Sequence, residues 1–234
     1  FRRMLFRSFT GANAVRGSAR MVEQLYEYGE RRVAGMDAAG IDVQVLSHGA
    51  PGTQQLAGEQ AITLARAAND RLQAIVGANP DRFAAFACLP TAEPAAAADE
   101  LERAVSRLGF AGAMIHGLTG RSFIDERRFW PIFERAQALD VPIYIHPSFP
   151  HPAVVEAYLQ DYAAEFPGLL NAAWGFTIEA ATQAIRLVVS GLFEAYPATK
   201  IVLGHLGESL PFSLWRIRSE EHTSELQSRF GISY

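Results

Sequence analysis

Short apolar runs alternate along the chain with longer segments in which apolar residues recur at helical spacing. The runs of strand length cover residues 43–46, 83–89, 112–115, 143–145 and 201–203. The segments with a three- or four-residue apolar period cover 61–75, 101–108 and 129–139. Pro90 and Gly109 stand where the second strand and the second helix should end. A longer helical section is expected over residues 154–196. The pattern therefore predicts strands alternating with amphipathic helices.

This alternation is typical of parallel β/α units, so the expected fold class is α/β. The strands are apolar throughout, as in sheets buried on both faces. Two architectures fit the pattern, a (β/α)₈ barrel and an open doubly wound sheet. No Gly-x-Gly-x-x-Gly motif follows an expected strand. Its absence argues mildly against a dinucleotide-binding sheet.

Composition narrows the classes of function. The 234 residues carry a formal net charge of −4 with scattered Lys and Arg, which disfavours a nucleic-acid partner. No apolar run approaches the roughly 18 residues that cross a membrane. The one cysteine, Cys88, cannot form an internal disulfide, so a reducing cytoplasm is the expected location. Because Leu89 and Pro90 follow it, a buried packing thiol is favoured over a nucleophile.

Histidines gather at the ends of the expected strands. Six histidines occur in the chain, and four lie within two residues of the carboxyl end of a strand, namely His48, His116, His146 and His205. A single histidine there would more often be a satisfied structural residue. Active sites of parallel α/β folds form on this rim, and imidazole is the commonest metal ligand and a frequent acid/base. The four together predict a metal site or a proton-transfer site.

Several short sequence motifs resemble those of one protein family. They lie at residues 36–47, 79–83, 129–134, 142–147, 203–208 and 215–217. Together they resemble the amidohydrolase-related family, in its branch of aminocarboxymuconate-semialdehyde, dihydroxybenzoate and resorcylate decarboxylases. The resemblance runs from about Val22 to Ile217. It implies a (β/α)₈ TIM barrel of the metal-dependent hydrolase type.

The resemblance also implies roles for individual residues. It implies one divalent metal ion, Zn²⁺ or Mn²⁺, with His146 as a ligand from the fifth strand. His205 matches the catalytic histidine, and Glu208 would orient it. Two family features, a ligand pair on the first strand and an aspartate on the last, have no matching residue in this sequence.

Three further residues are weaker candidates for substrate binding. His48 and His116 would contact substrate oxygens from the rim. Trp174 would pack over an aromatic ring, or else pack within a helix.

The activity that the resemblance implies is metal-dependent decarboxylation, a carbon–carbon lyase reaction on a small aromatic or unsaturated carboxylic acid. The alternatives are a metal-dependent hydrolase, for example one that opens a lactone, and an inactive fragment. Enzymes of the family form dimers or larger assemblies, so a homodimer or homotetramer is expected for the complete protein. A helix face with Leu159, Tyr162 and Phe166 would either form a subunit contact or pack on its own barrel.

The two ends of the chain match the family poorly. Residues 218–228 resemble the translation of a short-read sequencing adapter, and residues 5–8 resemble the end of the opposing one. The expected organisation is a poorly matched segment at 1–20, a partial barrel at 21–217 and a non-native tail at 218–234. Such a barrel would lack its first strand and last two strands. Because an unclosed sheet has open edges, this polypeptide is expected to be poorly stable and inactive by itself.

Overall fold

The computed structural model describes residues 23–219. The expected N-terminal segment 1–20 and residues 220–234 of the expected tail therefore lie outside the described residues. The chain divides into two compact units, 1–44 and 45–234. In the first unit the described part holds helix α3 (Glu30–Ala38), with Met36 buried. The Arg32 side chain donates hydrogen bonds to Gln44 and to the backbone carbonyl of Gln24.

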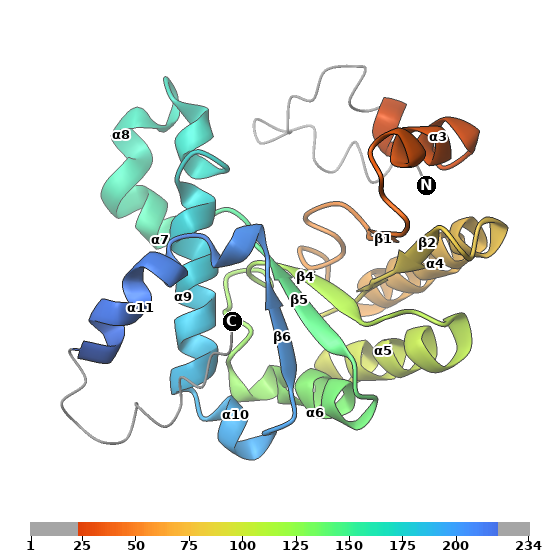
Figure 1. The fold of residues 1–234 in the computed structure, drawn as a ribbon. Helices are drawn as coiled ribbons and strands as arrows, with labels where there is room; N and C mark the ends of the chain where they lie inside the picture. The colour runs from red at the N-terminus through yellow and green to blue at the C-terminus, as the bar shows by residue number, and fades with distance from the viewer. Residues whose placement is uncertain (1–22, 220–234) are drawn as a thin grey trace. The chain divides into compact units, whose positions relative to one another are not determined.

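The second unit carries the parallel sheet (Figure 1). Strands β3 (Ala87–Cys88), β4 (Ala113–His116), β5 (Pro142–His146) and β6 (Lys200–Leu203) pair in sequence order. Strand β1 (Gln44–Leu46) pairs with β2 (Phe83–Ala85). The single strand expected over 83–89 is interrupted at Phe86, whose N–H donates to the Leu46 carbonyl, while the next N–H donates to Gly112. Successive N–H groups of this segment point to opposite edges, so the segment bonds to neighbours on both of its sides.

Helices cover one face of this sheet. They are α4 (Gly58–Ala78), α5 (Pro94–Leu108), η1 (Arg127–Phe129), α6 (Trp130–Ala138), α9 (Gly175–Val189), α10 (Leu192–Ala195) and α11 (Leu210–Ser219). Ala113, Ile115, Ile143 and Ile145 lie fully buried on the covered face. On β6, Leu203 packs against α9 and α11. Glycine at 109 ends α5 in the left-handed region with a φ of 73°, as the sequence indicated.

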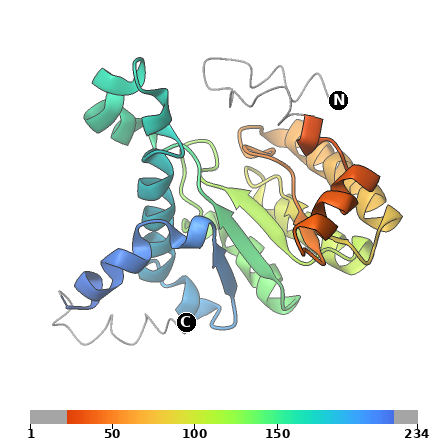
Figure 2. The ribbon, with the colours of Figure 1, turned by 45° about the horizontal axis from the view of Figure 1, so that its top comes forward.

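The strand order decides between the two architectures. In a doubly wound sheet the order reverses and helices lie on both faces. Here β3 to β6 lie side by side in chain order, and Figure 2 shows β4, β5 and β6 next to one another. Buried aliphatic side chains mark only one face. This arrangement is that of a (β/α)₈ barrel, and the described strands do not close it, which confirms the predicted fold class.

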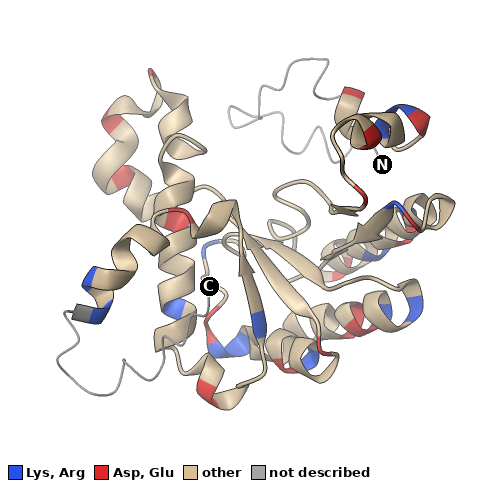
Figure 3. Ribbon diagram, viewed as in Figure 1, with Lys and Arg blue, Asp and Glu red and all other residues tan. Residues whose placement is uncertain are grey.

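The opposite face differs from the expectation that both faces would be buried. Met114, Tyr144 and His146 are only partly buried, and Val202 is exposed. In a closed barrel this face is filled by side chains from strands across the interior, and residues 23–219 leave it open on one side. Figure 3 shows positions of both charge signs interspersed along α5 and α6, with the strands mostly uncharged. Among the described helices, none has the length and apolarity to span a membrane.

The helical section expected over 154–196 is broken into short pieces. It comprises α7 (Pro152–Val154), η2 (Val155–Leu159), α8 (Gln160–Ala163), η3 (Pro167–Leu170), α9 and α10. Pro167 lacks an N–H, and Gly191 has a φ of 85° before α10. The expected shared face of Leu159, Tyr162 and Phe166 is also wrong. Leu159 is buried, whereas Tyr162 and Phe166 are 57% and 52% exposed, and Phe166 lies beyond the end of α8 at Ala163, so the three residues do not share one helix.

Candidate active site

The four predicted histidines lie on the carboxyl rim of the strands. His116 and His146 are the last residues of β4 and β5 and are partners in the sheet register. His48 and His205 follow the ends of β1 and β6 by two residues. Register partners on parallel strands point to the same face, so His116 and His146 are neighbours, with ring centroids 5.1 Å apart. The placement of the histidines on one rim is therefore confirmed.

His146 and His205 form the closest ring pair of the rim, with centroids 5.0 Å apart and planes at 84°. Gly204 makes this approach possible. Its N–H donates to the Ile145 carbonyl at 2.8 Å. A Cβ at this position would lie 2.9 Å from Cδ of Pro147 and 3.0 Å from the Ile145 oxygen. Only glycine lets the end of β6 lie this close to the end of β5.

His205 and Glu208 form a hydrogen-bonded pair. Nδ1 of His205 lies 2.7 Å from Oε1 of Glu208. A carboxylate accepts, so Nδ1 carries the proton and Nε2 of the neutral ring holds the lone pair. His205, Leu206 and Glu208 have φ values of 50°, 58° and 52°, in the left-handed region. Non-glycine residues pay for this conformation, and such strain clusters at functional sites.

His146 has the tautomer of a metal ligand. Its Nδ1 donates to the Pro147 carbonyl at 2.6 Å, which leaves the Nε2 lone pair available. Burial lowers the pKa of His146, the hydrogen bond to Pro147 opposes that shift, and the nearby His205 ring lowers the pKa further. The ring is therefore neutral near pH 7, which is the form that binds metal ions.

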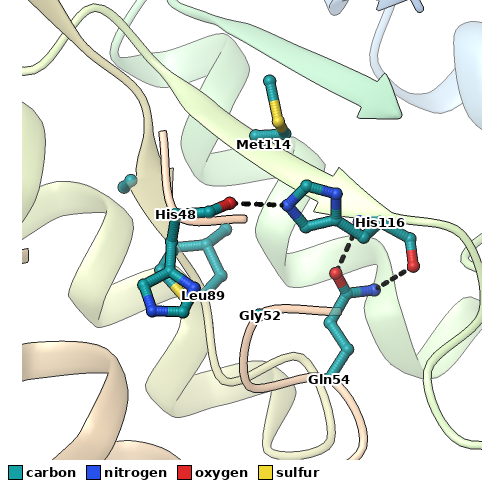
Figure 4. A pocket seen from close by; sticks show the side chains of 8 residues that line it. His48, Gly52, Gln54, Leu89, Met114 and His116 are labelled. Atoms are coloured by element: carbon teal, nitrogen blue, oxygen red, sulfur yellow. Dashed lines mark hydrogen bonds between the residues drawn. The ribbon is translucent and has the colours of Figure 1, made fainter. Parts of the chain in front are cut away.

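His116 is buried beneath this rim, where it ties β4 to the loops after β1 (Figure 4). Its Nε2 donates to the His48 carbonyl at 2.9 Å, and its backbone N–H donates to Oε1 of Gln54. Burial lowers the pKa of His116 to about 4. Its Nδ1 is buried with no partner among the described residues. The imidazole thus holds the rim together while remaining neutral.

His48 lines a small pocket with Gly52, Gln54 and Met114 (Figure 4). Its Nδ1 donates to the Gly49 carbonyl at 3.1 Å. Burial lowers the pKa of His48. The contact between His48 and His116 is made by the His48 backbone carbonyl, which accepts from the His116 ring, and not by the two rings.

The phenylalanine ring beside His146 and His205 is that of Phe176, two residues after the predicted substrate contact Trp174. The Phe176 ring centroid lies 6.1 Å from that of His146 and 5.8 Å from that of His205. Trp174 is 49% exposed and stands at the residue before α9. Phe176 lies two positions later, inside the first turn of α9. Sequence reasoning missed Phe176 because the phase of a helix relative to a distant strand rim is not encoded locally.

Two polar residues of α9 were also missed. Thr177 donates from Oγ1 to Oε2 of Glu208 at 3.0 Å. Glu179 is buried and accepts from the Ser148 N–H at 3.1 Å, two residues beyond His146. Burial raises the pKa of Glu179 to about 7. The first two turns of α9 therefore contact both the β5 and the β6 ends of the rim.

The donor set fits a divalent metal ion only in part. Within residues 23–219, no group of three or more His, Cys, Asp or Glu side chains is arranged to hold a metal. The fitting element is His146, a neutral imidazole with a free Nε2. Zn²⁺ and Mn²⁺ both accept imidazole nitrogen as a ligand.

Cys88 is a packing thiol, as the sequence favoured. It is buried at the end of β3, and burial raises its pKa. Its Sγ lies 3.6 Å from the hydroxyl oxygen of Thr53. A thiol in this environment is a poor nucleophile.

Comparisons with known proteins agree with this geometry. Residues 15–223 match the sequence profile of the family described as Amidohydrolase. Gamma-resorcylate decarboxylase from a Polaromonas species is 46% identical over 201 residues, which cover 83% of this chain and 60% of that protein. The chain spans about three fifths of the length of the curated relatives it matches.

Solved structures give the same likeness. A dihydroxybenzoic acid decarboxylase from Polaromonas, with bound manganese and 2-nitroresorcinol, is 43% identical with a TM-score of 0.79, covering 87% of this chain and 63% of that one. The 2,6-dihydroxybenzoate decarboxylase from Rhizobium is 39% identical with a TM-score of 0.78, covering 87% of this chain and 64% of that one. The strand rim, its histidines and the extent of these matches lead to one conclusion: the chain belongs to the amidohydrolase family.

Proposed function

We propose that the rim of His146, His205 and Glu208 belongs to a metal-dependent decarboxylase that acts on a small aromatic carboxylic acid. The observation that carries the proposal is the His205–Glu208 pair, held in van der Waals reach of the His146 ring. Three relatives, 39% to 46% identical, are named gamma-resorcylate decarboxylase, dihydroxybenzoic acid decarboxylase and 2,6-dihydroxybenzoate decarboxylase. An acid/base beside a metal ligand is the minimum that such a reaction requires.

His146 would contribute one ligand to Zn²⁺ or Mn²⁺. The bound ion would supply positive charge toward the carboxylate and the neighbouring phenol oxygens of the substrate. Phe176 walls the site beside both histidines and would stack against an aromatic ring. His48, His116 and Trp174 remain proposed substrate contacts, with His116 acting from a buried position beneath the others.

His205 would deliver the proton. A proton taken up at Nε2 produces an imidazolium whose charge faces the Glu208 carboxylate, which stabilises it. As the bond between the ring carbon and the carboxylate breaks, its electron pair stays on the ring carbon. That carbon takes the Nε2 proton, and CO₂ leaves. Glu208 keeps Nδ1 protonated throughout, so only Nε2 exchanges the proton with the substrate.

Two further proposals concern the oligomeric state and the cellular location of the complete protein. A homodimer or homotetramer is proposed for the complete protein, and a cytoplasmic location is proposed from its use of a single cysteine. Tyr162 and Phe166 are among the exposed large hydrophobic side chains of the described residues, and a subunit contact would cover them.

A chimera tests the proposed activity. Residues 45–217 replace the matching segment of the Polaromonas gamma-resorcylate decarboxylase, and CO₂ release from 2,6-dihydroxybenzoate is measured with Mn²⁺. We expect release, and a fall of about 10²- to 10⁴-fold in His205→Asn, the range for losing a general acid. His151→Asn is the matched control, because the His151 side chain caps the short helix α7 and stacks against Phe123.

Three outcomes separate the alternatives. Release that persists in His205→Asn refutes the assigned proton donor. A chimera that releases no CO₂ but hydrolyses a lactone panel favours the metal-dependent hydrolase. A folded, Mn²⁺-binding chimera with neither activity favours a segment that has lost its catalytic function.

A further inference from the structure

The carboxylate of Glu208 is held at both of its oxygens. Oε1 accepts from Nδ1 of His205 at 2.7 Å, and Oε2 accepts from the Thr177 hydroxyl at 3.0 Å. The three residues come from two separate parts of the chain, because Thr177 lies in the first turn of α9 and the pair follows β6. The Glu208 side chain is 15% exposed, so water has little access to replace either partner.

We propose that Thr177 is a positioning residue that acts through Glu208 to fix the ring orientation and tautomer of His205. A carboxylate with one partner rotates about its terminal torsion, which is broad in side chains. A second hydrogen bond at the other oxygen removes that rotation. The Oε1 lone pair then stays in line with Nδ1, and Nε2 stays directed toward the site. The effect on rate rests on the proposed function, whereas the effect on the tautomer does not.

The helix that carries Thr177 is itself fixed to the rim. A Cβ on Gly175 would lie 2.4 Å from the Leu170 carbonyl oxygen and 2.8 Å from Cδ of Pro150, so α9 begins in tight contact with the loop after β5. Two positions after Thr177, the Glu179 carboxyl accepts from the Ser148 N–H of the same loop. The Thr177 hydroxyl therefore links the His205–Glu208 pair to α9. Because α9 is packed against the loop after β5, the pair is held in a fixed position relative to His146.

The backbone around Glu208 explains why such support is needed. Glu208 has a φ of 52° and a ψ of −123°, and His205 and Leu206 also have positive φ. Such conformations persist only when surrounding contacts determine them. Among the described residues, the hydrogen bond from Thr177 links the Glu208 side chain to α9. Without it, α9 would contact the pair through the Phe176 ring, whose centroid lies 5.8 Å from that of His205, and Glu208 would lose its partner on α9.

The test compares Thr177→Val, which removes the hydroxyl at similar volume, with Thr177→Ser, which keeps it. Thr63→Val is the matched control, since Thr63 also donates to a glutamate, Glu59, from an exposed helix face. Ring ¹⁵N chemical shifts of the full 234-residue chain report the tautomer of His205, which is assigned by its loss in His205→Asn. Thr177→Ala repeats the test if the valine variant fails to fold.

We expect His205 to be the Nδ1–H tautomer in the wild type, Thr177→Ser and Thr63→Val, and a mixture of tautomers in Thr177→Val. In the chimera, Thr177→Val should lower the rate by about 10- to 100-fold, as is typical for groups that orient a site residue, with Thr177→Ser restoring most of it. An unchanged tautomer in Thr177→Val, or an equal change in Thr177→Ser or Thr63→Val, overturns the proposal.

The two proposals fail in different ways. A tautomer that responds as expected, in a protein that releases no CO₂, leaves Thr177 as the positioning residue and removes the decarboxylase. CO₂ release that is unaffected by Thr177→Val, together with an unchanged tautomer, leaves the decarboxylase and removes the role of Thr177.

Discussion

Glu179 should carry a proton in the folded protein below pH 7, and Glu179→Gln should remove the contribution of this group to the pH dependence of stability. The carboxyl is 2% exposed in α9. It accepts from the Ser148 N–H at 3.1 Å and from Nε2 of Gln183 at 2.7 Å. Both donors favour the anion, but burial outweighs them and raises the pKa of Glu179 from 4.5 to about 7.

The Gln183 amide can pair with either form of Glu179. Oε1 of Gln183 is buried with no partner among the described residues. If Glu179 is protonated, the Gln183 amide can turn over so that its oxygen accepts from the carboxyl O–H, and its nitrogen then takes the buried position without a partner. Glutamine at 179 has a similar shape and keeps an oxygen for the Ser148 N–H. It also keeps a donor for the Gln183 oxygen without a titrating proton.

The magnitude follows from the pKa values. Between pH 4.5 and 7 the unfolded chain loses the Glu179 proton and the folded chain keeps it, so stability falls as pH rises. At about 1.4 kcal/mol per pH unit, the full loss is about 3 kcal/mol. His116 opposes this, because its pKa, lowered to about 4, makes stability rise with pH over nearly the same interval. His48 and His146, whose pKa values are also lowered, act in the same direction as His116, so the contribution of Glu179 is isolated by comparing the variant with the wild type.

Urea denaturation from pH 4.5 to 8 measures the effect as a difference between variant and wild type. We expect Glu179→Gln to gain up to about 3 kcal/mol of unfolding free energy relative to the wild type as pH rises to 7, with no further gain above it. Glu59→Gln, on an exposed helix face, controls for the loss of one carboxylate. A difference between Glu179→Gln and wild type that does not change with pH would refute a protonated Glu179.

Three other predictions test the framework of the site. Gly204→Ala should lower the unfolding free energy by about 1–3 kcal/mol in urea denaturation, because its Cβ would lie within 3.0 Å of Pro147 and the Ile145 carbonyl; an unchanged midpoint would contradict the close approach. Cys88 should react with a thiol reagent only as the chain unfolds in urea, since its thiol is buried with a raised pKa, and fast labelling of the native chain would show otherwise. Asn69→Ala should cost about 1–3 kcal/mol for each buried group left unpaired, because its side chain bonds both backbone groups of Cys88; thermal unfolding measures this loss.

The chain of amino acids by itself determined the alternation of strands and helices, the end of α5 at Gly109 and the placement of histidines at strand ends. These features are local, because hydrophobic period and turn chemistry act over a few residues. The family could also be recognised from the sequence, because motifs such as Gly-His-Leu-Gly-Glu at 204–208 occur in the order and spacing of that family. The breaks in the helical section over 154–196 could not be predicted from the sequence. Apolar residues keep a helical spacing there, although the π-helical turns and Pro167 interrupt the helix.

Only the tertiary structure decided which side chains meet. The register of β4 and β5 places His116 beside His146, and Gly204 lets β6 bring His205 to the same ring. Phe176, Thr177 and Glu179 gain their roles from the position of α9, which has no signature in its own sequence. Contacts between segments some thirty residues apart, such as Thr177 with Glu208, depend on packing rather than on local preference. The chemistry of the site therefore became visible in the sequence as a set of candidates, and folding selected their partners and tautomers.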